Sequence, residues 1–245
     1  MALGNWKVRS GRRVRGLLVA ALTLGAVVAS VHAADAVSPV KIGIIGTGHI
    51  GGALAKLWVA SGHEVFLSSR HPEDLKALAD SLGVRAHVGT PRAAAVFGDV
   101  VLVSVPYKAL PQLGQDLKAE LAGKIVLDTC NPYPERDGLM AVAVRQEGTG
   151  VASQRFLAGV RLVRAFNAIG WRDLAHQVRR DGEPVAIPLA GDDAQALEIA
   201  QRLVTDAGFA PVVVGGLSRA REFDVGTMPY THLLTAAKLR KALAP

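Results

Sequence analysis

From about residue 40, short runs of Val, Ile and Leu alternate along the chain with stretches of helical periodicity. Such runs predict buried strands, and the periodic stretches between them predict helices that cover a parallel sheet. We predict eight strands, near residues 41–46, 64–69, 85–88, 99–105, 124–129, 160–167, 184–191 and 210–216. Eight strands in about 175 residues favour one continuous α/β sheet.

Helical patterns occupy most of the intervals between these runs. We predict helices over residues 50–61, 72–82, 107–121, 192–207 and 230–243. Residues 131–150, "NPYPERDGLMAVAVRQEGTG", are rich in Pro and Gly and show little periodicity. We expect a loop there, and one of this length is more often functional or mobile than merely connective.

The first 33 residues have a different pattern. A basic part, "KVRSGRRVRG", precedes an uncharged apolar run, "LLVAALTLGAVVAS", and small residues then favour cleavage after Ala33. This layout is typical of a secretory signal peptide, and the run is shorter than the roughly 20 residues of a membrane span. Arg12 and Arg13 stand where a twin-arginine signal has them. We expect export to the periplasm, with an uncleaved tether to the inner membrane as the alternative.

Residues 40–245 are then the folded domain, with residues 160–245 as its C-terminal extension. The formal charge of +7 falls to +2 without residues 1–33, because that segment holds five bases and no acids. A nearly neutral domain has no basic footprint for nucleic acid. The single Cys130 forms no internal disulfide, and no His or Cys spacing suits zinc, so we expect no metal. A homodimer is left open.

A glycine motif follows the first predicted strand. Gly46, Thr47, Gly48, His49, Ile50 and Gly51 match G-x-G-x-x-G and open a predicted helix. This context binds a dinucleotide: the first glycine permits a tight turn, the second lets the backbone approach the pyrophosphate, and the third lets helix and strand pack closely. The fold class predicted is therefore α/β, a Rossmann-type doubly wound, mostly parallel sheet with covering helices.

The end of the second predicted strand selects the dinucleotide. An acid there would bind the ribose 2′-hydroxyl of NAD, but this chain has Ser68, Ser69 and Arg70. Ser69 can donate to a 2′-phosphate and Arg70 can pair with it, so we predict NADP as the cofactor. The alternative makes Arg70 a solvated charge and the serines the cap of the next helix.

Further candidates follow the fourth and fifth predicted strands. Val105, in "SVPYKA", and Asn131, in "DTCNP", should reach the carboxyl edge of the sheet, where ligands of such folds lie. Asn131 is equally well explained as a turn residue before Pro132. Cys130 fits a small buried residue better than a nucleophile. No Tyr-x-x-x-Lys pair and no G-x-S-x-G elbow occurs, so the catalytic residues are unknown.

With these motifs the chain resembles the deazaflavin:NADPH oxidoreductase family, which is grouped with the N-terminal domain of pyrroline-5-carboxylate reductases. It is also similar to the soluble nucleotide domain of six-transmembrane ferric reductases. The resemblance runs from Lys41 to about Leu234, through "IGTGHIGGALA", "GHEVFLSSR", "VSVP", "DTCNP", "EGTG", "RLVRAFNAIG", "LAGDD" and "AGFAPVVVGGLSRARE". The family's NADP contacts would fall on Thr47, Gly48, His49, Ile50, Ser69, Arg70, Val105 and Asn131.

The chain also departs from these relatives. Strands continue to residue 216 where a helical dimerisation domain would follow in a pyrroline-5-carboxylate reductase, and no transmembrane bundle follows. We therefore expect an NADP-dependent oxidoreductase that passes hydride between nicotinamide and a small-molecule acceptor: a flavin, a deazaflavin or an imine-like compound. A flavin or deazaflavin would be a second ligand. The acceptor should lie beside Phe166 and Asn167. The alternative is a non-catalytic exported protein that binds NADP or a partner.

Overall fold

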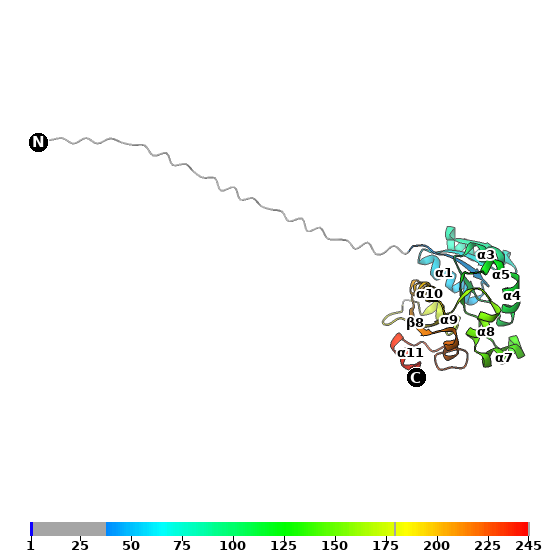
Figure 1. The fold of residues 1–245 in the computed structure, drawn as a ribbon. Coiled ribbons are helices and arrows are strands. Elements are labelled where there is room, and N and C mark those ends of the chain that lie inside the picture. The colour runs from blue at the N-terminus through cyan, green and yellow to red at the C-terminus, as the bar shows by residue number, and fades with distance from the viewer. Residues whose placement is uncertain (2–37, 179, 245) are drawn as a thin grey trace. The chain divides into compact units, whose positions relative to one another are not determined.

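The structure is a computed structural model that describes residues 38–178 and 180–244, besides Met1. The predicted signal peptide, with its twin-arginine pair and its cleavage position, lies outside the described residues. The folded part is an eight-stranded sheet between layers of helices (Figure 1).

All eight predicted strands are present in one sheet. They are β1 (Lys41–Ile45), β2 (Glu64–Ser68), β3 (Ala86–Gly89), β4 (Val100–Val103), β5 (Ile125–Asp128), β6 (Arg161–Arg164), β7 (Ala186–Gly191) and β8 (Ala210–Gly215). The strand order is β3-β2-β1-β4-β5-β6-β7-β8. Every neighbouring pair is parallel except β6 and β7, so the prediction of a mostly parallel Rossmann-type sheet is confirmed.

The strand order reverses between β1 and β4. Chain connections leave β1 toward β2 and β3 on one side and toward β4, β5 and β6 on the other. In doubly wound sheets a crevice opens at such a switch point, beyond the carboxyl ends of the strands. The glycine turn after β1 and the segments after β4 and β5 therefore meet at one edge.

Alternate side chains of the strands enter two apolar layers. Ile42 and Ile44 of β1 join the larger core, and Ile45 joins the core on the opposite face. The period of two in a strand produces this division, and burial on both faces explains why the strands are apolar throughout. The larger core includes side chains of α1 (His49–Ala60), α2 (Lys76–Leu82), α9 (Trp171–His176) and α10 (Ala194–Asp206).

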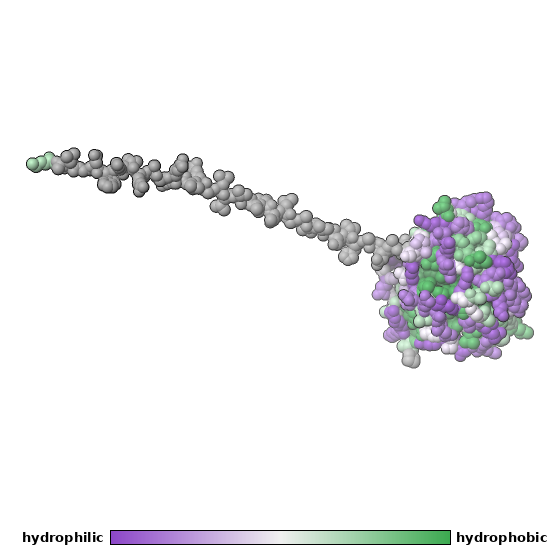
Figure 2. All heavy atoms as spheres, turned by 45° about the horizontal axis from the view of Figure 1, so that its top comes forward, coloured by the Kyte–Doolittle hydropathy of each residue, from purple (hydrophilic) through white to green (hydrophobic). Residues whose placement is uncertain are grey.

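The second core is covered by α3 (Pro91–Phe97), α4 (Leu110–Asp116), α5 (Lys118–Leu121), α7 (Leu139–Glu147) and α8 (Thr149–Phe156). Figure 1 shows these helices gathered on one side of the sheet. The remaining helices are α6 (Pro134–Asp137), α11 (Ala236–Ala242) and the 3-10 helices η1 (Pro72–Leu75), η2 (Gly83–Arg85), η3 (Tyr107–Ala109) and η4 (Leu217–Phe223). On the face drawn in Figure 2, apolar residues form patches among polar ones.

The expectation of a loop over residues 131–150 is wrong. Residues 134–156 form α6, α7 and α8, joined at Gly138 (φ +66°) and Gly148 (φ +101°). Positive φ is the conformation that glycine adopts at least cost, so these glycines end one short helix and begin the next. Ala141 and Val144 of α7 are buried, so packing against the core stabilises this helix. Its sequence pattern is too short to predict it.

Other helix predictions need smaller corrections. The helix expected over residues 107–121 is divided into η3, α4 and α5, and only residues 236–242 of the range 230–243 are helical. Besides α6, α7 and α8, two further α-helices were not predicted, α3 and α9. Thr90 and Pro91 signalled the first of these, because the Thr90 side chain accepts a hydrogen bond from the Ala93 amide and proline suits the first helical turn.

Candidate functional site

The glycine turn after β1 has the close approaches that a dinucleotide site needs. Gly46 has φ +95°, and a Cβ there would lie 2.3 Å from the Ser104 carbonyl oxygen. A Cβ on Gly51 would lie 2.4 Å from the Gly46 carbonyl oxygen. Real Cβ atoms do not approach backbone so closely, so both positions require glycine. The turn is thereby held against β4 and against the start of α1.

Gly48 lies in different surroundings from the other two glycines. A Cβ at this position would meet no atom within 4 Å, and the backbone has an ordinary φ of −86°. Gly48 is the N-cap residue of α1 and no side chain caps the helix. The N–H groups of the first helical turn lack intrahelical partners and carry the positive end of the helix dipole. The residues thus fit a pyrophosphate beside Gly48, His49 and Ile50.

Thr47 fastens this turn to the end of β2. Its hydroxyl donates to the Ser68 carbonyl oxygen at 3.1 Å and accepts from the Ser68 amide at 3.1 Å, and its own amide donates to the same carbonyl. Ser68 is fully buried and donates its hydroxyl proton to the Ile44 carbonyl. Ser68 therefore links β1 to β2 through hydrogen bonds and is not accessible to a ligand.

Ser69 and Arg70 leave the sheet at the end of β2. The Ser69 hydroxyl accepts a hydrogen bond from the His71 amide at 2.9 Å, so it stabilises the turn, while its own proton remains to be donated. Arg70 is exposed and has no ion-pair partner among the residues described. A guanidinium held at this edge without a carboxylate suits an anionic 2′-phosphate.

Val105 and Asn131 lie at the same edge, as expected, but Asn131 is engaged within the protein. Its side-chain amide donates to the Asn167 carbonyl oxygen at 2.7 Å, and its backbone carbonyl accepts from Arg136 at 2.6 Å. The Val105 amide donates to the Cys130 sulfur at 3.4 Å. Cys130 is buried, and burial together with the charge of Asp128 raises the pKa of its thiol, so it is a structural residue rather than a nucleophile.

A buried charge cluster lies beneath Asn131. Arg164, fully buried at the end of β6, donates to Asp128 Oδ2 at 2.8 Å and to the Cys130 carbonyl at 2.7 Å. Asp224 Oδ1 lies 3.3 Å from the same guanidinium. Burial lowers the pKa of Arg164, but the negative charges of Asp128 and Asp224 outweigh it and raise the pKa above its ordinary value. One cation between two carboxylates fixes the ends of β5 and β6.

Two features at this edge were not predicted from the sequence. The hydroxyls of Tyr133 and Tyr230 form a hydrogen bond of 2.5 Å across 97 positions of sequence. The imidazole of His49 stacks on Trp171 of α9, with ring centroids 4.3 Å apart. Both pairings join segments far apart in the chain, so no local pattern signalled them.

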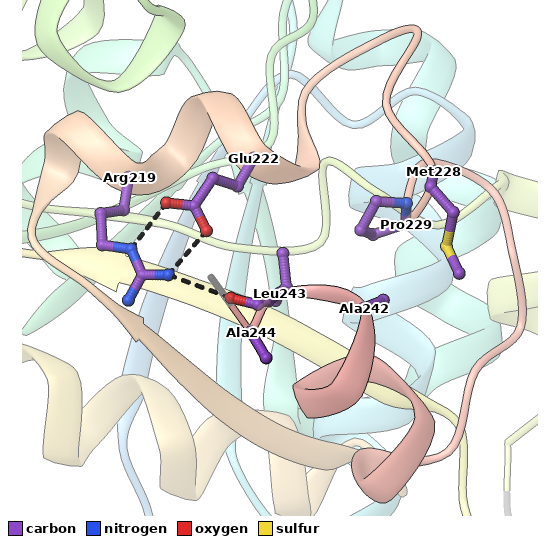
Figure 3. A pocket seen from close by; sticks show the side chains of 7 residues that line it. All are labelled: Arg219, Glu222, Met228, Pro229, Ala242, Leu243 and Ala244. Atoms are coloured by element: carbon purple, nitrogen blue, oxygen red, sulfur yellow. Dashed lines mark hydrogen bonds and ion pairs between the residues drawn. The ribbon is translucent and has the colours of Figure 1, made fainter.

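Two hollows are present among the described residues, one away from the glycine turn and one beside it. One, of about 630 Å³, lies between η4 and the C-terminal helix, where Arg219 pairs with Glu222 and donates to the Leu243 carbonyl (Figure 3). The other, of about 340 Å³, is bordered by Gly48, His49, Lys56 and Trp171 and so lies beside the glycine turn. In the part of the chain that is described, no helix is long and apolar enough to cross a membrane, and no three metal-binding side chains converge.

The sequence matches a known protein family over part of its length. Residues 41–132 match the family described as NADP oxidoreductase, coenzyme F420-dependent. The chain is also 32% identical over 188 residues to the metalloreductase STEAP3 of Rattus norvegicus. That alignment covers 75% of this chain but 36% of the metalloreductase, so the chain spans little more than a third of that relative.

Solved structures share the fold. A hypothetical protein from Sinorhizobium meliloti superposes with a TM-score of 0.69 at 24% identity, covering 81% of this chain and 96% of that one. A protein named as an F420-dependent NADP reductase, from Arthrobacter sp. FB24, superposes with a TM-score of 0.62 at 23% identity, covering 74% and 87% of the two chains. At these identities the likeness concerns the fold.

Proposed function

From the premise that residues 41–132 form a domain of the NADP oxidoreductase, coenzyme F420-dependent, family, we propose that this chain transfers hydride between the nicotinamide of NADP and a flavin, deazaflavin or small imine-like acceptor. The related proteins support an NAD(P)-dependent oxidoreductase. The identity of the hydride acceptor is our proposal. When bound, the nicotinamide supplies the hydride chemistry, and the protein binds and aligns the two reactants.

The observation that carries the proposal is a pair of phosphate-binding positions, one after β1 and one after β2. The open space at Gly48 and the free N–H groups of α1 suit a pyrophosphate. Arg70 and the Ser69 hydroxyl suit a 2′-phosphate. A dinucleotide held at these two points extends its nicotinamide over the ends of β4 and β5, near Val105 and Asn131. The acceptor then lies over the segment of Phe166 and Asn167, whose side chains are themselves buried.

Binding of NADPH and NADH to the Arg70→Ala variant tests the cofactor assignment. We expect the NADPH dissociation constant to rise roughly 10-fold or more, because a charge-assisted hydrogen bond of about 1.5–3 kcal/mol is lost, while NADH binding changes little. Titration calorimetry measures both constants. Arg85→Ala is the matched control, since Arg85 is also exposed but precedes β3 at the opposite edge of the sheet. An equal loss of NADPH and NADH affinity contradicts the 2′-phosphate contact.

A turnover assay tests the reaction. NADPH oxidation should occur with one of three acceptors: FMN, a 5-deazaflavin or a cyclic imine. The second candidate function is a non-catalytic exported protein that binds NADP or a partner, and it rests on the lack of a familiar catalytic motif. NADPH binding without turnover on any acceptor favours this second function.

The location is proposed from residues 1–33. Their basic, apolar and small-residue pattern supports export to the periplasm. Mass spectrometry of the protein from cells measures its N-terminus. A mature chain that begins at Ala34 supports cleavage, and an intact N-terminus supports a membrane tether.

A further inference from the structure

The Tyr133–Tyr230 pair stands at the edge where the acceptor is proposed to lie. Tyr133 follows Asn131 by two residues, beyond the end of β5. Tyr230 precedes Thr231, whose amide donates to the Ala168 carbonyl beyond the end of β6. The Asn131 side chain joins these two segments through its bond to the Asn167 carbonyl. The two hydroxyls therefore meet above the ends of β5 and β6.

The spacing of strands places this pair within reach of a nicotinamide. Neighbouring strands lie about 4.8 Å apart, so β5 is about 10 Å from β1, where the pyrophosphate would bind. The nicotinamide half of a dinucleotide extends along this edge from the switch point. Both tyrosines are only partly buried, so ligands can approach them.

Charged groups around the pair are mostly basic. The Arg136 guanidinium lies 5.1 Å from the Tyr133 ring centroid, and Arg145 binds the Pro132 carbonyl. Asp137 accepts the Tyr133 amide but is paired with Arg136. Burial and the bond to Tyr133 raise the pKa of Tyr230, so the phenol is protonated near neutral pH, while Arg145 acts in the opposite direction.

We propose that the hydrogen-bonded Tyr133–Tyr230 pair is the proton donor to the acceptor, a role that rests on the proposed function. The hydride and its electron pair pass from the nicotinamide to one atom of the acceptor's double bond. The π pair moves to the other atom, which takes the O–H proton of one tyrosine. The phenolate left behind keeps its electron pair and is stabilised by the hydroxyl of the other tyrosine and by Arg145. Water then returns the proton.

The alkaline titration of the phenols tests contact with the nicotinamide without turnover. The chain has three tyrosines, so single Tyr→Phe variants assign each phenolate absorbance change. NADP⁺ and NADPH differ only in the nicotinamide ring, which is a cation in NADP⁺ and is neutral, with one added hydrogen, in NADPH. We expect NADP⁺, but not NADPH, to lower the pH midpoint of phenolate formation in the wild type and in Tyr107→Phe. The shift should be lost or halved in Tyr133→Phe and Tyr230→Phe.

Tyr107→Phe is the control because it also removes a hydrogen-bonded hydroxyl, which binds Ser153 and the Thr149 carbonyl in the core and lies outside the proposed acceptor site. In turnover with 1-pyrroline or FMN, Tyr133→Phe and Tyr230→Phe should lower kcat about 100-fold, the usual effect of losing a general acid, and reduce the solvent deuterium isotope effect. Their dissociation constants for NADPH should change less than about 3-fold.

The possible outcomes separate the two proposals. If the wild type turns over and both variants keep its kcat and its isotope effect, the pair has only a structural role. That result overturns this inference but not the proposed function. If NADP⁺ and NADPH shift the titration equally, the pair does not touch the nicotinamide end, which also overturns it. If the wild type binds NADPH and reduces none of FMN, a 5-deazaflavin and 1-pyrroline, the proposed function fails and this inference fails with it.

Discussion

Two of the three glycines of the turn after β1 are explained by a neighbouring backbone carbonyl, and the third has no close neighbour. Gly46 is pressed against the Ser104 carbonyl and Gly51 against the Gly46 carbonyl, whereas Gly48 faces open space. The first two positions are constrained by the fold of the free protein. At Gly48 nothing in the free protein requires glycine, whereas a ligand close to the backbone would. This position therefore indicates the side of the turn where a pyrophosphate would lie.

Alanine substitutions at these glycines should separate folding from binding. Gly51→Ala is expected to lower the free energy of unfolding by about 1–3 kcal/mol, because its Cβ would overlap backbone. Gly48→Ala should lower it by less than about 1 kcal/mol and yet raise the NADPH dissociation constant roughly 10-fold. Urea denaturation of the apo protein and calorimetric titration measure the two effects.

Gly52→Ala is the control for these variants. Position 52 lies within α1, and its Cβ would meet only side-chain atoms at ordinary contact distances. This variant should keep or gain stability, since alanine favours a helix interior by about 0.5–1 kcal/mol over glycine. Unchanged NADPH binding in Gly48→Ala would argue that the pyrophosphate does not approach this turn.

At the scale of elements, a buried polar contact joins the helices after β5 to the end of the sheet. Thr149, the first residue of α8, is fully buried, and its hydroxyl lies 2.5 and 2.6 Å from the two carboxylate oxygens of Asp224. Asp224 in turn approaches the Arg164 guanidinium at the end of β6. The segment predicted as a loop is thus fixed to the sheet through α8, and the tyrosine at position 133 is held with it.

Removing either partner of this contact should destabilise the fold. Asp224→Ala is expected to lower the free energy of unfolding by about 3–5 kcal/mol, because it leaves the buried Arg164 charge less compensated. Thr149→Val should cost about 1–3 kcal/mol, since the carboxylate loses its closest donor. Equilibrium unfolding in urea gives both values.

The more exposed Arg155–Glu147 pair offers a comparison on the same helices. Glu147→Gln should change stability by less than about 1 kcal/mol, as for most surface ion pairs. A cost for Asp224→Ala as small as that of Glu147→Gln would show that the buried cluster does not stabilise the edge.

At the scale of the whole molecule, His63 joins three parts of the fold at the edge opposite the candidate site. Its Nδ1 accepts from the Val40 amide at 3.1 Å, so Nε2 carries the proton and donates to Asp206 Oδ2 at 3.0 Å. The ring is fully buried. Burial lowers the pKa of His63 below its ordinary 6.5 and outweighs Asp206, which raises it. His63 is therefore neutral at pH 7.

This burial predicts a loss of stability in mild acid. The unfolded chain binds the His63 proton at a higher pH than the folded chain does, so the stabilisation is complete above pH 6.5 and declines as pH falls through the lowered folded pKa. The free energy of unfolding should fall more between pH 7 and pH 5 in the wild type than in His63→Gln, which has no proton to bind. Parallel pH profiles for the two proteins would contradict this explanation.

Much of the fold was predicted because its signals are local. Each strand is a short apolar run, and the glycine motif and the Ser69-Arg70 pair each lie within a few residues of a strand end. The helices of residues 134–156 were missed because four to nine residues per helix give too little periodicity, and their glycines resemble loop signals. The role of Asn131 was left open, since its partner at position 167 is 36 residues away.

The sequence alone determined the strands, the α/β class and the glycine turn, because each follows from the order of neighbouring residues, and the preference for a 2′-phosphate stays a prediction from Ser69 and Arg70. The tertiary structure alone decided that β7 runs antiparallel to β6, that Arg164 lies between two carboxylates, and that Tyr133 meets Tyr230. These features depend on which distant segments pack together. That choice is made by burial and pairing over the whole chain, and no short stretch of sequence contains it.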